Sequence, residues 1–175
     1  MDKPQRLPAS SWWVYFDASA LIKRYSAESG TPFVNQAFQA TAAHRRMCLI
    51  LGLLEVISTL VRKRNDRRLE EKMFHQALLT FRAEVMQADD FEILSVGDPL
   101  ILAAAPLIEK HNLNATDAIV LRSALEARER LRSQGERLLL LAADKRLVRA
   151  AEAEGIIALD PEVDSLERLH QFLSA

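Results

Sequence analysis

Residues 12–25 read Trp-Trp-Val-Tyr-Phe-Asp-Ala-Ser-Ala-Leu-Ile-Lys-Arg-Tyr, and this stretch predicts the first strand and the first helix of the fold. Its first five residues are aromatic or β-branched, which favours a short buried strand. Asp17 follows directly, and the small and aliphatic residues after it are spaced for the inner face of a helix. A strand that turns at once into a helix places Asp17 at the carboxyl edge of a sheet, where ligands bind in open α/β sheets.

The rest of the chain alternates short apolar segments with longer helical patterns. Strands are expected at residues 12–17, 46–49, 91–96, 138–141 and 156–159. Helices are expected at residues 18–26, 32–42, 49–61, 69–88, 98–111, 114–133 and 144–154, with a short one at the C-terminus. This alternation predicts an α/β fold, a three-layer α/β/α sandwich with a short parallel β-sheet whose central strand is the first.

Length and composition bound the class of protein. The 175 residues suffice for one domain with a core, so we expect a disordered or loose tail at 1–11 and a single domain over 12–175. A net charge of −1 weakens a purely nucleic-acid-binding function but not an enzyme with an acidic site. With one cysteine, no signal-peptide pattern and no long apolar run, we expect a cytoplasmic protein without a membrane segment.

Four carboxylates are candidates for a site. Asp17 and Asp144 stand where a strand passes into a helix, so each could simply cap that helix. Asp117 opens a helix beside Thr116, and either of these two could be its cap. Glu55 is different, because it lies in the middle of the apolar run 49–61, which predicts a buried helix. An ionised carboxylate there is costly unless a cation or several donors meet it. The alternative is that Glu55 points outward at a rim or pairs with an arginine.

The four acids together point to a metal. The carboxyl ends of parallel strands share one edge of the sheet, and an acid in a buried helix or at a helix start can reach that edge. Carboxylates brought together repel one another, and a divalent cation among them relieves the repulsion. Oxygen ligands favour Mg²⁺ or Mn²⁺ over zinc, and such ions support phosphodiester hydrolysis.

These segments also resemble the PIN-domain ribonucleases of the VapC-like toxin group, over roughly residues 13–160. The most specific match is residues 17–30, with an acid, a hydroxyl residue two positions on, Ala-Leu, a Lys, a Tyr and a Glu before Gly. Residues 54–60, 116–124 and 141–147 resemble the second, third and fourth acid segments. The resemblance implies a metal-dependent endoribonuclease, the toxin of a type II toxin–antitoxin pair. The implied catalytic and metal-binding acids are Asp17, Glu55, Asp117 and Asp144, supported by Ser19 and Thr116.

The resemblance also implies Mg²⁺ or Mn²⁺ as cofactor and three partners: an RNA substrate, a small antitoxin and a second copy of the chain. Helices 32–42 and 69–88 could line an apolar groove for the antitoxin, although core packing explains their apolar faces equally well. Candidate RNA contacts are Lys23 and the start of the basic cluster 62–68, namely Arg62, Lys63 and Arg64. The alternatives are an exposed helix face for Lys23 and a solvated helix end for the cluster.

One position departs from the family pattern. Ala142 stands where the family often has Thr or Ser, so a hydroxyl is missing two residues before Asp144. This departure favours, as an alternative, a non-catalytic PIN-like binding or scaffold protein with a partly degenerate acidic site. A dehalogenase-like phosphatase also begins with an acid after its first strand, but it usually has a second acid two residues on, where this chain has Ser19.

Overall fold

The computed structural model describes residues 11–173 of the chain. The loose tail expected at 1–11 therefore lies outside the described residues except for Ser11. The prediction of a single domain over 12–175 stays a prediction. No helix within the described range is long and apolar enough to cross a membrane.

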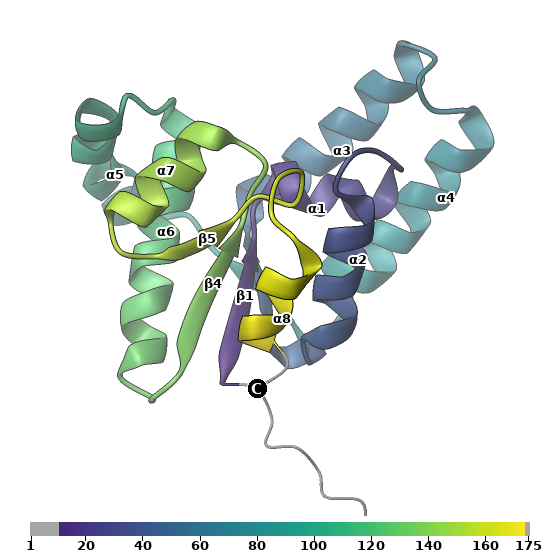
Figure 1. The fold of residues 1–175 in the computed structure, drawn as a ribbon. Coiled ribbons are helices and arrows are strands. Elements are labelled where there is room, and N and C mark those ends of the chain that lie inside the picture. The colour runs from purple at the N-terminus through teal and green to yellow at the C-terminus, as the bar shows by residue number, and fades with distance from the viewer. Residues whose placement is uncertain (1–10, 174–175) are drawn as a thin grey trace, which may run out of the picture.

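A parallel five-stranded sheet with strand order β3-β2-β1-β4-β5 forms the middle layer of the molecule (Figure 1). β1 pairs with β2 on one side and with β4 on the other, so the first strand is central, as predicted. The α/β fold with a short parallel sheet between helices is confirmed. The strands are β1 (Trp12–Phe16), β2 (Arg46–Leu49), β3 (Phe91–Leu94), β4 (Arg137–Leu141) and β5 (Ile157–Leu159).

Helices cover both faces of the sheet, and each face has its own apolar core. Successive side chains of a strand point to opposite faces of the sheet, so β1 contributes to both cores. Val14 and Phe16 lie in the first core and Tyr15 lies in the second. The first core is covered by α1 (Ala18–Tyr25), α2 (Thr31–Ala40), α3 (Ile50–Asn65), α4 (Glu71–Phe81) and α8 (Leu166–Leu173). The second is covered by α5 (Asp98–His111), α6 (Ala115–Arg132) and α7 (Lys145–Ala153).

Two short irregular helices complete the chain. A 3₁₀ turn, η1 (Ala43–Arg45), leads into β2, and a π-helical turn, η2 (Arg82–Met86), continues α4. The single helix predicted over 69–88 is therefore an α-helix from Glu71 followed by a π turn.

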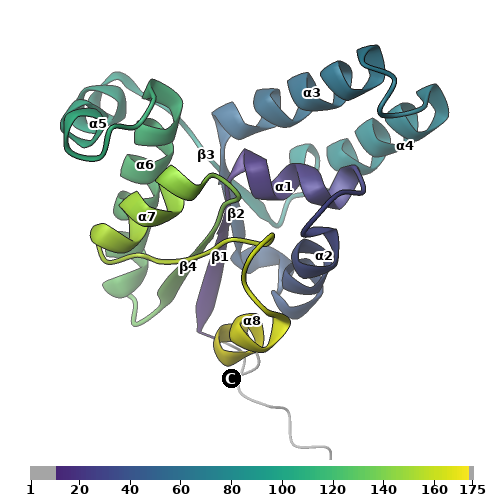
Figure 2. The same ribbon diagram turned by 45° about the horizontal axis from the view of Figure 1, so that its top comes forward.

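The prediction that residues 49–61 form a helix buried on all sides is wrong. Leu53, Val56 and Leu60 of α3 are buried, but Ile50 is 43% exposed and Leu54 is 66% exposed. α3 packs on α1 and α4 with one face, and Figure 2 shows α3 and α4 running away from the sheet as a pair. An apolar run shows that a helix has an inner face, but only the neighbouring elements decide how much of its circumference is covered.

Candidate active site

A cavity of about 740 Å³ opens at the carboxyl edge of the sheet. Asp17 reaches it from the end of β1, Asp144 from the turn after β4, Glu55 from α3 and Asp117 from α6. The structure thus places all four predicted acids around one space, together with Ser19, whereas Thr116 is not among the residues that line it. The topology explains this meeting, because β1 and β4 are adjacent and parallel.

Ser19 ties the first acid to the neighbouring turn. The Asp17 carboxylate caps α1 and accepts hydrogen bonds from the backbone N–H of Ser19, at 2.9 Å, and from the Ser19 hydroxyl. The Ser19 oxygen in turn accepts from the backbone N–H of Ala143, at 2.9 Å. Ala142 is fully buried in the core. The Ser19 hydroxyl therefore supports the turn that carries Asp144, where Ala142 has no hydroxyl to do so.

Capping accounts for two of the acids and not for the others. Asp144 caps α7, with its Oδ1 accepting from the backbone N–H groups of Arg146 at 2.8 Å and Leu147 at 3.1 Å. At the start of α6 the cap is Asn114, whose side chain accepts from the Asp117 N–H at 2.8 Å and donates to Asp117 Oδ2 at 2.7 Å. The expectation that Thr116 or Asp117 caps this helix is wrong, and Asn114 instead fixes the orientation of the Asp117 carboxylate.

Burial and mutual repulsion raise the pKa values of the acids. Burial raises the pKa of Asp17 more than its bonds from Ser19 lower it. Burial, followed by the charges of Asp17 and Asp117, raises the pKa of Glu55 to about 7. Burial, followed by the charges of Asp144 and Asp17, raises the pKa of Asp117 to about 6. Within residues 11–173, Glu55 has no ion-pair partner, so the predicted alternative of a neutralising arginine is not found.

The donor set fits a hard divalent cation by its chemistry. The four acids provide only oxygen ligands, and raised pKa values are expected of carboxylates that repel one another without a cation between them. As the side chains lie, no three His, Cys, Asp or Glu residues in the described part of the chain stand close enough together to hold an ion. To bind a cation, the carboxylates would therefore have to move closer together, and the positive charge of the cation would favour this movement.

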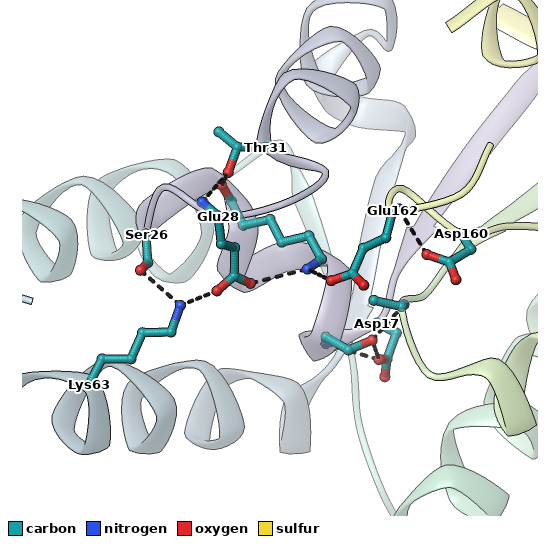
Figure 3. Close-up of polar contacts among 10 residues, drawn as sticks. Asp17, Ser26, Glu28, Thr31, Lys63, Asp160 and Glu162 are labelled. Atoms are coloured by element: carbon teal, nitrogen blue, oxygen red, sulfur yellow. Dashed lines mark hydrogen bonds and ion pairs between the residues drawn. The ribbon is translucent and has the colours of Figure 1, made fainter. Parts of the chain in front are cut away.

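A chain of ion pairs around two buried lysines, unforeseen in the sequence, borders the same cavity (Figure 3). Lys23 Nζ of α1 contacts Glu28 Oε1 at 3.1 Å and Glu162 Oε1. Lys63 Nζ of α3 contacts Glu28 Oε2 and donates to Ser26 Oγ at 2.9 Å. We call Lys23, Glu28, Lys63 and Glu162 the lysine network. It joins α1, α3 and the turn after β5, and it provides the structural role that the sequence did not assign to Glu28.

The network corrects the expectations for both lysines. Lys23 is 3% exposed, so the alternative of an exposed helix face is wrong, and Lys63 is 9% exposed, so it is not part of a solvated helix end. The Lys63 ammonium is turned toward Glu28 and Ser26, and its contact with RNA stays a prediction. Packing of α1 against α3 buries both side chains, and Glu28 between them, together with Glu162 beside Lys23, compensates their charges. Arg62 is exposed and lines the cavity, whereas Arg64 lies over the ring of Phe74 at 4.5 Å.

The network also shifts the pKa values of Glu28 and Lys23. Burial alone would raise the pKa of Glu28, but hydrogen bonds from Lys63 and Lys23 outweigh it and hold that pKa below its ordinary value. Burial alone would lower the pKa of Lys23, but the contacts with Glu162 and Glu28 hold it above its ordinary value. Both groups therefore stay charged at neutral pH.

The helices proposed to line an antitoxin groove bury their apolar faces in the core. Phe33 and Phe38 of α2, and Phe74 and Phe81 of α4, belong to the first apolar core. Core packing thus explains the pattern that suggested a groove, and the groove stays a prediction.

The comparisons with known proteins agree with this architecture. A family model described as PIN domain matches residues 14–153. No curated protein matches the chain in sequence. Among solved structures, a toxin–antitoxin complex from Klebsiella pneumoniae is similar at 20% identity with a TM-score of 0.57, over 85% of this chain and 97% of that one.

Two further structures share the fold. FitAcB from Neisseria gonorrhoeae is 14% identical with a TM-score of 0.58, over 86% of this chain and 99% of that one. VapBC2 from Rickettsia felis, bound to a DNA fragment from their promoter, is 10% identical with a TM-score of 0.52, over 84% and 97%. At these identities the likeness concerns the fold alone. Because the family model spans most of the chain, the protein belongs to the PIN domain family.

Proposed function

We propose that this chain is a metal-dependent endoribonuclease that hydrolyses RNA phosphodiesters and is the toxin of a toxin–antitoxin pair. PIN domains are generally nucleases, which supports the class of reaction. The observation that carries the proposal is the meeting of four carboxylates around one cavity, with the pKa of Glu55 raised to about 7 in the absence of any internal ion-pair partner in the described part of the chain.

Asp17, Glu55, Asp117 and Asp144 would hold Mg²⁺ or Mn²⁺ in this cavity. When bound, such a cation would supply Lewis-acid chemistry to the phosphodiester and lower the pKa of the attacking water. Ser19 keeps the Asp17 carboxylate oriented toward the cavity through its hydroxyl and its N–H. Asn114 does the same for Asp117.

Arg62 supports an RNA path at the rim of the cavity. Its side chain is exposed and lines the cavity at the end of α3. Cations at such a position attract the phosphate backbone independently of sequence. A substrate of cellular RNA also implies a cytoplasmic location, which we include in the proposal.

We further propose an antitoxin and a second copy of the chain as partners. One of the structures that share this fold is described as a toxin–antitoxin complex, which supports a protein partner. Leu54, which lines the cavity, and Ile50 one turn earlier are exposed apolar side chains on the same side of α3. This exposed strip gives a partner apolar surface beside the site.

The test is cleavage of single-stranded RNA by the pure protein. We expect cleavage with Mg²⁺ or Mn²⁺, loss of cleavage with EDTA, recovery on adding Mn²⁺, and no cleavage by Asp17→Asn. Cleavage that survives both EDTA and Asp17→Asn would contradict the site assignment.

The second candidate is a non-catalytic PIN-like binding or scaffold protein. It is favoured by the spacing of the carboxylates, because no three potential ligands among residues 11–173 are close enough for an ion as they lie. Titration calorimetry separates the two proposals. Heat of Mn²⁺ binding that disappears in Glu55→Gln supports the nuclease, and the lack of any Mn²⁺ binding supports the scaffold.

A further inference from the structure

Lys23 is a buried cation on the wall of an otherwise acidic cavity. The lining includes six carboxylates, those of Asp17, Glu28, Glu55, Asp117, Asp144 and Glu162, but only two cations, Lys23 and Arg62. Arg62 is exposed at the rim, whereas the Lys23 side chain is 4% exposed. An RNA phosphate that approaches the four proposed ligands is repelled by the carboxylates around it, and Lys23 is the buried positive group on that wall that can offset the repulsion.

The two carboxylates that hold Lys23 differ in how firmly they are fixed. Glu28 is also bound by Lys63, and its backbone N–H donates to Thr31 Oγ1 at 3.0 Å. The Glu162 side chain is 40% exposed, and within the described chain Lys23 is its carboxylate's partner. If Glu162 turns away, Lys23 therefore keeps the compensating charge of Glu28.

The backbone under Glu162 is held in place, so only its side chain needs to move. The N–H of Glu162 donates to the buried Asp160 Oδ1 at 2.9 Å, and Asp160 itself accepts from the backbone N–H groups of Val163 and Asp164 through its carbonyl oxygen. Gly30, at φ +84°, packs so closely on this turn that a Cβ there would lie 2.8 Å from the Pro161 carbonyl oxygen. Figure 3 shows the Glu162 side chain reaching from this turn toward the network.

We propose that Lys23 binds an RNA phosphate, and that the Glu162 carboxylate occupies the place of that phosphate until RNA enters. The inference rests on the proposed function. Both groups present anionic oxygens to the same ammonium, so they compete for it. The contact with Glu162 contributes little to stability, because its side chain is 40% exposed and loses freedom in forming the pair, and because Glu28 stays beside Lys23 when Glu162 leaves. A phosphate with neighbouring contacts along the RNA can therefore displace Glu162.

A different role for Glu162, as an additional metal ligand, leads to the opposite result. Removing a ligand weakens Mn²⁺ binding and slows cleavage, whereas removing a competitor for phosphate strengthens RNA binding and leaves Mn²⁺ binding unchanged. The two roles are thus separated by the direction of the change.

The experiment compares Glu162→Gln with the wild-type chain in RNA cleavage. We expect KM to fall by about fivefold, the effect of removing one partly screened charge contact. The Mn²⁺ affinity, measured by calorimetry, should stay within twofold. Glu109→Gln is the matched control, because it removes the same charge from an exposed residue outside the cavity and should leave KM unchanged. An unchanged or higher KM, or weaker Mn²⁺ binding, in Glu162→Gln would overturn the proposal.

Lys23→Met tests the other half of the pair. It keeps most of the volume of the side chain, and Glu28 retains Lys63. KM should rise, and adding Glu162→Gln to Lys23→Met should give no further fall in KM. A fall of the same size in both backgrounds would overturn the role of Lys23, and Glu162→Gln alone still decides the competition if Lys23→Met fails to fold.

Inorganic phosphate provides a second probe that does not depend on RNA cleavage. Calorimetry should show phosphate binding more tightly to Glu162→Gln than to wild type, and the gain should vanish when Lys23→Met is added. If no variant cleaves RNA but this pattern holds, the proposed function fails and the anion site stands. If RNA is cleaved but phosphate binds equally to all variants, the anion site fails and the function stands.

Discussion

Two groups of acids line the same cavity and differ in what neutralises them. Glu28 lies between the ammonium groups of Lys23 and Lys63, which hold its pKa below the ordinary value. Glu55 lies on the same helix as Lys63, about two turns away, yet its pKa is raised to about 7. Both carboxylates are partly buried in one protein and at one site, so the local partner decides the direction of the shift.

The difference distinguishes structural from functional charge. The lysine network contains its own cations and holds α1, α3 and the turn after β5 together. The four proposed ligands repel one another, and none of them forms an ion pair with a cation among residues 11–173. A protein that keeps a costly group of this kind at a cavity has a use for an external cation, which is the physical basis of the proposed function.

Glu55→Gln tests the group of proposed ligands, and we expect it to have the largest effect of the substitutions. We expect RNA cleavage to fall on the order of 100-fold or more, because a proposed ligand is lost. The stability of the metal-free protein should stay equal or increase, since a repelled carboxylate is removed. Rates with Mn²⁺ and urea unfolding in EDTA measure the two effects. Normal cleavage by Glu55→Gln would remove this residue from the site.

Glu28→Gln tests the lysine network, and we expect it to destabilise the fold. The change leaves Lys63 buried without a carboxylate, and we expect the free energy of unfolding to fall by about 1–3 kcal/mol, less than for a fully buried pair because Glu28 is partly exposed. Urea unfolding measures it, with Glu109→Gln as the control for loss of one surface charge. Wild-type stability in Glu28→Gln would show that the network is dispensable for folding.

The pH dependence of stability should reveal the raised pKa values of two proposed ligands, Glu55 and Asp117. The pKa values of Glu55, about 7, and Asp117, about 6, lie above their ordinary values of 4.5 and 3.8. The folded state therefore binds more protons than the unfolded state between about pH 4 and 7, and stability falls as pH rises through that window. We expect the melting temperature in EDTA to drop by a few degrees from pH 5 to pH 8.

The matched control for this decline is Glu55→Gln, in which the drop should be smaller. Added Mn²⁺ should oppose the drop, because the cation binds the ionised carboxylates and stabilises the folded state. A melting temperature that rises from pH 5 to pH 8 in EDTA would contradict the repulsion among the acids.

Glu162→Gln should have the smallest effect on stability. Its side chain is 40% exposed and Glu28 stays beside Lys23 in its absence, so we expect the free energy of unfolding to change by less than about 1 kcal/mol. Urea unfolding of Glu162→Gln and Glu28→Gln, measured in parallel, compares the two losses, because both residues contact Lys23. An effect as large as that of Glu28→Gln would mean that Glu162 is a fixed part of the network.

Periodicity and local signals were enough to predict most of the fold. Alternating apolar strands and helices specify a parallel sheet, and β1 lies at its centre as expected. The same signals failed for α3, whose apolar run indicates an inner face without showing that Leu54 remains exposed. They also failed at α6, where Asn114 rather than Thr116 or Asp117 is the cap, because several residues with capping side chains stand next to one another.

The order of the strands in the sequence was sufficient to predict that two of the carboxylates meet. Asp17 and Asp144 follow parallel strands, and parallel strands share one carboxyl edge, so their order in the chain places both acids at the cavity. The burial and the partners of the two lysines, in contrast, depend on packing between elements that are distant in sequence. Lys63 meets Glu28 across 35 positions of sequence, and Lys23 meets Glu162 across 139. A local pattern shows that a side chain is charged, but its burial and its partner depend on which distant elements pack against it.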